Sequence, residues 1–168
     1  AVPMFVQRAQ KKDTNCTSGI ATLVGLVETI IDREADRAER IALEVDKLGQ
    51  TIFEVKGGQS TRSRRFDVTI KSIGREGEIT SRSRDCLSSF DRLLTYLASI
   101  MTERGDDKAL RARVKTASRD VNSLFLHVGS IANKIQFLLD ATLGMISIEQ
   151  NNIIKLFSVA SVALMPPT

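Results

Sequence analysis

The sequence has no proline between residues 4 and 165, because its three prolines occupy positions 3, 166 and 167. Proline interrupts helices by removing a backbone donor and by clashing with the preceding turn, so a chain this free of it can form very long helices. A composition of 42% hydrophobic and 26% charged residues is typical of a folded chain. We therefore predict an all-α protein with three long antiparallel helices that pack like a coiled coil, preceded by a short helix.

Apolar residues recur at steps of three and four along three successive stretches, as the buried side of a long helix requires. The stretches cover residues 20–55, 60–104 and 107–165, and the sequences Gly57-Gly58 and Arg104–Asp107 separate them. Side chains suited to cap the three helices precede or begin each stretch. These candidate caps are Thr17 or Ser18, then Ser60 or Thr61, and then an aspartate of the pair Asp106 and Asp107.

The expected helix lengths predict the overall shape. At 1.5 Å per residue the three helices span roughly 55, 65 and 90 Å. Short connections make neighbouring helices antiparallel, so the first and third run in the same direction and the third extends beyond the other two. Residues 1–12 place Phe5, Val6 and Ala9 on one face, with Pro3 suited to a first turn, and so predict the short helix.

Charged residues on the first long helix allow two interpretations. Glu28, Asp32 and Asp36 share one face and could hold a metal ion, but a solvated face with local ion pairs is the favoured alternative. The predicted pairs are Asp36 with Arg40, Glu34 with Arg37, and Glu44 with Lys47.

The positive charge of the chain is concentrated in one segment. Residues 59–84 hold seven basic and three acidic side chains, and seven minus three gives +4, which equals the formal net charge of the whole chain. Nucleic-acid binding is not expected, because no aromatic residues are interspersed for base stacking. Contact with anionic lipid headgroups or a plain solvated face remain the two open alternatives. The basic residues are Arg62, Arg64, Arg65, Lys71, Arg75, Arg82 and Arg84.

Recognisable catalytic motifs are missing from the sequence. It has no glycine-rich phosphate loop, no HExxH motif and no nucleophile elbow, and its one histidine, His127, stands apart from any other candidate ligand. Cys16 and Cys86 lack metal-binding spacing, so we expect reduced thiols. We predict that the chain is not an enzyme.

The segment from Asp140 to Thr168 loses its polar face as it proceeds. After Ile153 only Lys155 and two serines interrupt an apolar run that continues to Met165. About 13 apolar residues are too few to span a bilayer, which needs roughly 20. The run is therefore either a buried core helix or the first turns of a membrane span. The basic segment at the same end of the predicted bundle favours the second alternative.

The motif IEQNNIIKLFSVASVALMPPT (148–168) closely resembles the start of the first transmembrane helix in the CorA family of magnesium channels, and GLVETIIDREAD (25–36) is similar to an earlier helix of that family. The resemblance implies a homopentameric channel that passes hydrated Mg²⁺, with Co²⁺ or Ni²⁺ as further candidates, across the bacterial inner membrane. It also implies three regions. Residues 1–19 would end a cytoplasmic domain, 20–152 would form the cytoplasmic helical stalk, and 153–168 would begin the pore helix in contact with membrane lipid.

The resemblance further implies which residues line the pore. They are Asp140, Leu143, Ser147, Asn151, Ile154, Phe157 or Ser158, Ser161 and Met165, and their steps of three and four put them on one helical face. Asp140 and Asn151 would meet the hydrated metal ion, because Mg²⁺ keeps its water and prefers oxygen ligands. The apolar positions would form constrictions.

Three further points follow from the comparison with the family. The sequence ends before the family's Gly-Met-Asn signature and second span, so we expect this chain alone not to conduct ions. The zinc-transporter branch of the same superfamily is an alternative within the class. From a different class, the alternative is a soluble coiled-coil interaction module whose apolar tail packs on itself.

Overall fold

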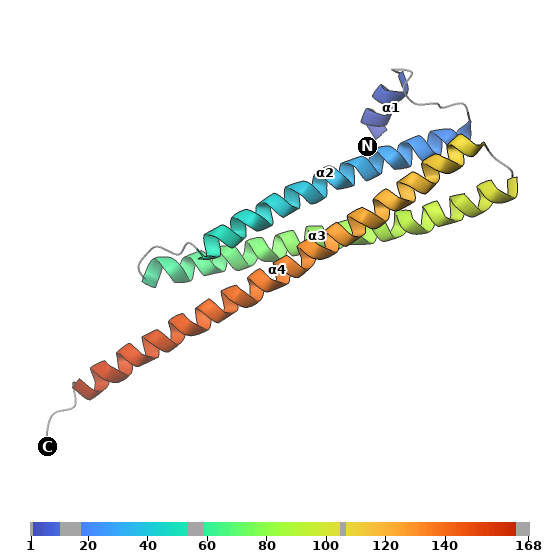
Figure 1. Cartoon of the computed structure of the whole chain (residues 1–168). Helices are drawn as coiled ribbons and strands as arrows, with labels where there is room; N and C mark the ends of the chain where they lie inside the picture. Colours follow the sequence, from blue (N-terminus) through green and yellow to red (C-terminus); the bar gives the residue numbers. More distant parts are fainter. Residues whose placement is uncertain (1, 11–17, 54–58, 105–106, 164–168) are drawn as a thin grey trace.

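A computed structural model describes residues 2–10, 18–53, 59–104 and 107–163. These residues form four helices: α1 (Val2–Gln10), α2 (Gly19–Phe53), α3 (Gln59–Arg104) and α4 (Lys108–Ala163). The three long helices alternate in direction, α3 packs most extensively against α4, and α1 lies against α2 (Figure 1). The predicted all-α fold with three long antiparallel helices is confirmed, and α4 extends well beyond the ends of its neighbours (Figure 1).

Side-chain caps fix the starts of α2 and α4. Ser18 Oγ accepts a hydrogen bond of 3.2 Å from the backbone N–H of Ala21, and Asp107 Oδ1 accepts one of 3.3 Å from the N–H of Ala109. These two predicted caps are confirmed, whereas Thr17 and the Gly57-Gly58 turn lie outside the described residues. The predicted cap at Ser60 or Thr61 is wrong, because α3 already begins at Gln59.

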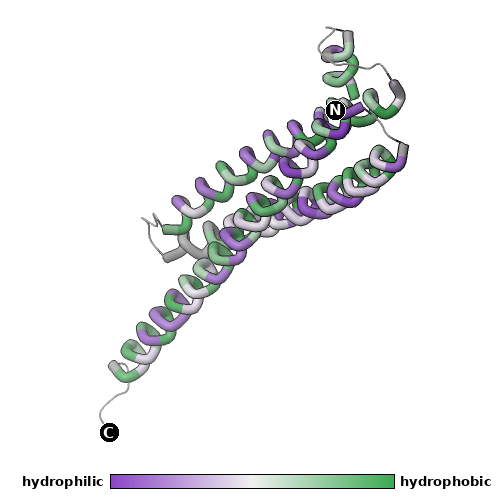
Figure 2. The backbone as a smooth tube through the Cα atoms, turned by 45° about the vertical axis from the view of Figure 1, so that its right-hand side comes forward, coloured by the Kyte–Doolittle hydropathy of each residue, from purple (hydrophilic) through white to green (hydrophobic). Residues whose placement is uncertain are grey.

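The buried side chains follow the predicted seams and form one continuous core. Hydrophobic and hydrophilic residues alternate along every long helix (Figure 2), which gives each a side to bury and a side to expose. The largest fully buried side chains come from all three long helices. They are Val24, Val27, Val45, Ile52, Ile73, Leu87, Leu94, Met101, Val114, Val121, Val128 and Leu138.

The buried side of α3 carries small and polar residues in the middle of the helix. Between Ile73 and Leu87 the side that packs inward carries Gly77, Thr80 and Ser83, of which Thr80 and Ser83 are buried. A β-carbon added to Gly77 would lie 3.7 Å from Ile135 Cγ2, so α3 and α4 approach closely at this level. Small residues therefore replace a bulky apolar seam where these two helices meet.

A buried polar cluster joins α2 to this part of α3. The Glu34 side chain is 6% exposed and forms an ion pair of 2.8 Å with Arg37. Its second oxygen, Oε2, and the hydroxyl of Ser83 are buried without a hydrogen-bond partner among the described residues. Burial raises the pKa of the Cys86 thiol, and the charge of Glu34 acts in the same direction while that of Arg37 opposes it. Cys86 is a free, half-buried thiol, and Cys16 lies outside the described residues.

Two of the three ion pairs predicted within α2 are present. Glu34 pairs with Arg37, and Glu44 pairs with Lys47 at 2.7 Å, as expected. Arg40 instead donates from Nε to the backbone carbonyl of Asp36 at 3.4 Å. On α1, Phe5 and Ala9 are half-buried, whereas Val6 is 45% exposed and so does not join the buried face.

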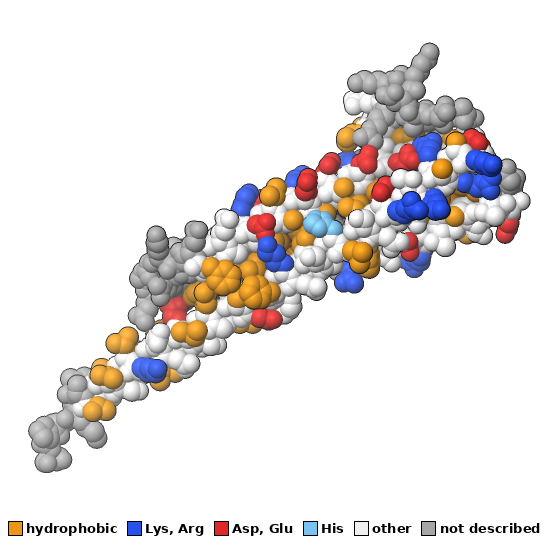
Figure 3. Space-filling model, viewed as in Figure 1, with side chains coloured by type: hydrophobic (Ala, Val, Ile, Leu, Met, Phe, Trp, Pro, Cys, Tyr) orange, Lys and Arg blue, Asp and Glu red, His pale blue; other side chains and the backbone are white. Residues whose placement is uncertain are grey.

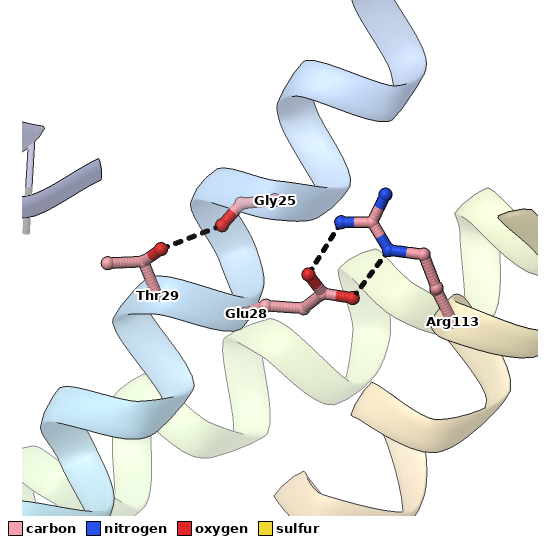
Figure 4. Close-up of polar contacts among 4 residues, drawn as sticks. All are labelled: Gly25, Glu28, Thr29 and Arg113. Atoms are coloured by element: carbon pink, nitrogen blue, oxygen red, sulfur yellow. Dashed lines mark hydrogen bonds and ion pairs between the residues drawn. The ribbon is translucent and has the colours of Figure 1, made fainter. Parts of the chain in front are cut away.

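Two ion pairs tie α2 to α4 across the bundle. Arg113 donates from Nε to Glu28 Oε1 at 3.0 Å and from a terminal nitrogen to Oε2 at 2.6 Å (Figure 4). Lys134 pairs with Asp46 further along the same two helices. On the other side of Glu28, the Thr29 hydroxyl donates to the carbonyl of Gly25 (Figure 4). Glu28, one of the three carboxylates in the alternative metal site, is therefore paired with Arg113. Among the described residues, no three His, Cys, Asp or Glu side chains are grouped so that they could hold a metal ion.

Replacing Glu28 by glutamine should lower the free energy of unfolding by about 1–2 kcal/mol. Both side chains of this pair are about one third exposed, so the interaction is partly shielded from water, and its bidentate geometry is lost with the charge. Urea unfolding followed by circular dichroism measures the change. The matched control is Glu44→Gln, which breaks an exposed pair and should alter stability by less than about 0.5 kcal/mol. Equal effects of the two substitutions would contradict the assignment of Glu28–Arg113 as the stronger tie.

Candidate pore-lining face of α4

The C-terminal part of α4 leaves the bundle. Thr142 is the last buried residue of α4 among those described. After it, Met145 and Glu149 are half-buried, and every described side chain from 150 to 162 is exposed. Exposure there includes large apolar groups, with Phe157 at 71% and Val162 at 75%. Figure 3 shows hydrophobic side chains on the surface of the projecting end.

This exposure decides between two of the sequence-based alternatives. A buried core helix would cover Ile153 and the residues after it, but the described part of the run has no neighbour from α1, α2 or α3 to cover it. The interpretation as a module whose tail packs on itself is wrong for the same reason. Exposed apolar side chains that continue over several turns of a helix are typical of a segment that contacts lipid or other protein chains.

The described members of the predicted pore line share one exposed stripe. At 3.6 residues per turn, Asp140, Leu143, Ser147, Asn151 and Ile154 lie on the side of α4 opposite the one that packs on the bundle. The packed side at the same level is formed by Leu138, Thr142 and Met145. Ser158 and Ser161 continue the stripe, Phe157 lies at its flank, and Met165 is outside the described residues. We call the set Asp140, Leu143, Ser147, Asn151, Ile154, Ser158 and Ser161 the outer stripe.

Hydrogen bonds within α4 determine what the serines of the outer stripe can offer. Ser147, Ser158 and Ser161 donate their hydroxyl protons to backbone carbonyls four residues earlier, at 3.1, 2.9 and 2.8 Å. With its proton engaged, each hydroxyl oxygen is left as an acceptor. A hydrated Mg²⁺ ion presents water protons outward, so it is recognised by acceptors. The stripe therefore has the polarity that a hydrated cation requires.

Asp140 stands at the start of the outer stripe and is exposed. Gln136, one turn earlier, donates from Nε2 to Asp140 Oδ1 at 3.0 Å and so restrains the carboxylate. Sequence reasoning did not single out Gln136, although its spacing of four residues from Asp140 is the signal that could have found it. The carboxylate adds a negative charge to a stripe otherwise made of neutral acceptors and apolar groups.

The exposed surface of α4 is poor in charge well before the outer stripe begins. From residue 122 to 152, the only exposed charged side chains are Lys134 and Asp140, and Lys134 is paired with Asp46. The exposed positions hold residues such as Asn122, Leu126, Asn133 and Phe137. Depletion of charge on an exposed face is typical of surfaces that contact other protein chains. The single histidine, His127, is exposed on the same helix and has no metal-ligand cluster around it among the described residues.

Comparison with known proteins identifies the family of the chain. A family model described as "CorA-like Mg2+ transporter protein" matches residues 1–168. The chain belongs to this family. It is 32% identical over 168 residues to a magnesium transport protein CorA of Yersinia pestis, and 31% identical over the same length to that of Escherichia coli K12. Both alignments cover the whole chain and 51% of the relative.

A third relative, the magnesium transport protein CorA of Pasteurella multocida, is 35% identical over 146 residues, which cover 87% of this chain and 44% of that protein. The chain thus spans about half the length of the curated relatives it matches. The resemblance drawn from residues 148–168 is confirmed and extends over the whole chain, and membership places it in a family of metal-ion transport proteins. No helix in the described ranges is both long and apolar enough to cross a bilayer.

Proposed function

We propose that this chain is the stalk and pore entrance of a CorA-type transporter, in which several copies of α4 line a shared path for hydrated Mg²⁺. The observation that carries the proposal is the position of the outer stripe. The stripe faces away from the bundle of its own protomer, and it continues onto the projecting end of α4. Polar acceptors exposed on one side of a helix, with the opposite side packed, suit a helix that contributes one wall of a channel.

The proposed assembly is a homopentamer in the bacterial inner membrane, with α2, α3 and the first part of α4 on the cytoplasmic side. The charge-poor surface of α4 between residues 122 and 152 supports contact between copies of this helix. Asp140 would form a ring of carboxylates that concentrates cations, and Asn151 would accept hydrogen bonds from the water around the ion. Ile154 and Phe157 would narrow the path. Co²⁺ and Ni²⁺ are further candidate ions, and no catalytic step is part of the proposal.

Cross-linking between copies of the chain tests this arrangement. In a background without Cys16 and Cys86, Ser147→Cys should yield covalent dimers with a short bismaleimide, because the outer stripes of neighbouring copies face a common axis. Native mass spectrometry in detergent should show five copies. The matched control is Ser89→Cys, which places a thiol on the exposed side of α3. A strictly monomeric chain, or equal cross-linking at Ser89, would contradict the shared path.

A further inference from the structure

A cavity opens between the last turns of α3 and the first turns of α4, at the end of the bundle opposite to the projecting end of α4 (Figure 1). Its volume is about 480 Å³, which is within the range of sites that hold small molecules. Three buried side chains, Leu94, Met101 and Val114, form the apolar part of its lining. The cavity lies away from the outer stripe and has no role in the function proposed above.

Three cations border this cavity, and none of its lining residues is acidic. Arg111, Lys115 and Arg119 follow one another at steps of four residues along α4, so they form one row about 12 Å long, which we call the basic row. Like charges at this spacing repel each other. None of the three side chains forms an ion pair or a hydrogen bond with another described residue. Figure 3 shows Lys and Arg side chains on the surface over the first turns of α4.

The guanidinium of Arg111 differs from that of Arg113, two residues later, in its partners. Arg113 is neutralised by Glu28 in a bidentate pair. The Nε of Arg111 is buried and has no hydrogen-bond partner among the described residues, although a buried donor that is left unpaired costs free energy. Asp107, the acidic residue nearest to Arg111 in sequence, caps α4 at Ala109. A ligand in the cavity would therefore supply the acceptor that Arg111 lacks.

Hydroxyl groups complete the polar part of the lining. Thr95 and Thr102 of α3 donate to the backbone carbonyls of Asp91 and Ala98 at 2.9 and 2.8 Å, so their oxygens are left as acceptors. On the α4 side, Ser118 makes no such bond with a described residue and can donate. The α4 side of the cavity thus offers donors and positive charge, and the α3 side offers neutral acceptors. This arrangement suits a ligand with an anionic end and an uncharged end.

We propose that the cavity binds a soluble organic phosphate of about the size of a nucleotide. Its phosphate groups would contact the basic row, because guanidinium groups bind phosphate oxygens in a bidentate manner. Its uncharged part would cover Leu94, Met101 and Val114. The apolar run begins at Ile153, which is 38 residues from Lys115 (153 minus 115), or about 57 Å along α4. The phosphates of a bilayer that α4 enters there could not reach the cavity, so a soluble ligand is expected.

Calorimetric titration of the full 168-residue chain with ADP, in a non-ionic detergent at about 0.1 M salt, tests the proposal. ADP should bind more tightly than pyrophosphate, which lacks the uncharged part, and more tightly than adenosine, which lacks the phosphates. The double substitution Arg111→Gln and Lys115→Gln should weaken ADP binding about a hundredfold, since each charge-assisted hydrogen bond contributes about a factor of ten.

A second variant tests the apolar part of the cavity without a change of charge. Ala98 lines the cavity and is exposed, so Ala98→Phe places a bulky side chain over it without entering the core. ADP binding should fall about tenfold, because the ligand loses apolar contact equivalent to about two methylene groups. Urea unfolding shows that each variant is folded, and excess ADP should raise the urea midpoint of the unchanged chain more than that of either variant.

The matched control separates position from total charge. Lys71→Gln with Arg75→Gln also removes one lysine and one arginine four residues apart, from exposed positions of α3 outside the cavity. This pair should leave ADP binding as it is in the unchanged chain. Equal weakening by both double variants, no saturable binding of ADP, or pyrophosphate binding as tight as that of ADP would overturn the inference. None of these results bears on the proposed function, because the cavity and the outer stripe lie on different parts of α4.

Discussion

Replacing Asn151 by leucine is expected to lower Mg²⁺ flux about a hundredfold in a transporter that contains this chain. Asn151 is exposed on the outer stripe between Ser147 and Ile154, and its amide offers an acceptor to the water around the ion. Each lost acceptor costs about 0.5 kcal/mol, at the lower end for a net hydrogen bond, so five copies around the path together raise the barrier by about 2.5 kcal/mol. A barrier raised by about 2.7 kcal/mol slows passage a hundredfold.

The measurement uses a chimera in which this chain replaces the matching part of the Escherichia coli relative, reconstituted in liposomes with a Mg²⁺-sensitive dye inside. The matched control is Asn152→Leu, which makes the same chemical change about 100° around the helix and off the outer stripe. Flux in this control should stay within about threefold of the unchanged chimera, a barrier change below about 0.7 kcal/mol. Full flux in Asn151→Leu, or equal losses in both variants, would contradict the assignment of the stripe.

Much of this fold could be predicted because the long helices depend on local features. The lack of proline and the spacing of Val24, Val45, Leu94 and Val121 define helices and their buried sides without knowledge of the partner helix. The caps at Ser18 and Asp107 are likewise local, since each binds a backbone group within a few residues. A cap depends on where a helix begins, and a start of α3 two or three residues earlier than expected was enough to rule out the predicted cap.

Other features depend on contacts between distant segments. The pair Glu28–Arg113 joins residues 85 positions apart, and only the register of α2 and α4 brings them together. Glu34 and Ser83 are buried because the helices approach closely. The spacing of apolar residues could not predict this burial, because both side chains are polar. The end of α4 is the third case. The apolar run predicts that this part of α4 is covered by another surface. Because α2 and α3 are too short to reach it, that surface does not belong to the same protomer.

Leu138→Ala is expected to lower the free energy of unfolding by about 3 kcal/mol, the largest stability change predicted for this chain. Leu138 is 2% exposed, and its Cδ2 lies 3.5 Å from the position of a β-carbon on Gly49 of α2. Removing the side chain leaves a cavity beside a glycine, which has no side chain to move into it, so the loss includes both transfer and cavity terms. Urea unfolding at fixed protein concentration gives the value.

The control for Leu138→Ala is Leu143→Ala, which removes the same atoms from the outer stripe five residues later. Leu143 is 49% exposed within the protomer, so its loss should change the free energy of unfolding by less than about 0.5 kcal/mol. In the chimera, however, Leu143→Ala should alter Mg²⁺ flux, because that side chain faces the proposed path. The two leucines thus separate the packed side of α4 from its outer stripe. A large stability loss at Leu143, or a negligible one at Leu138, would mean that the two sides are wrongly assigned.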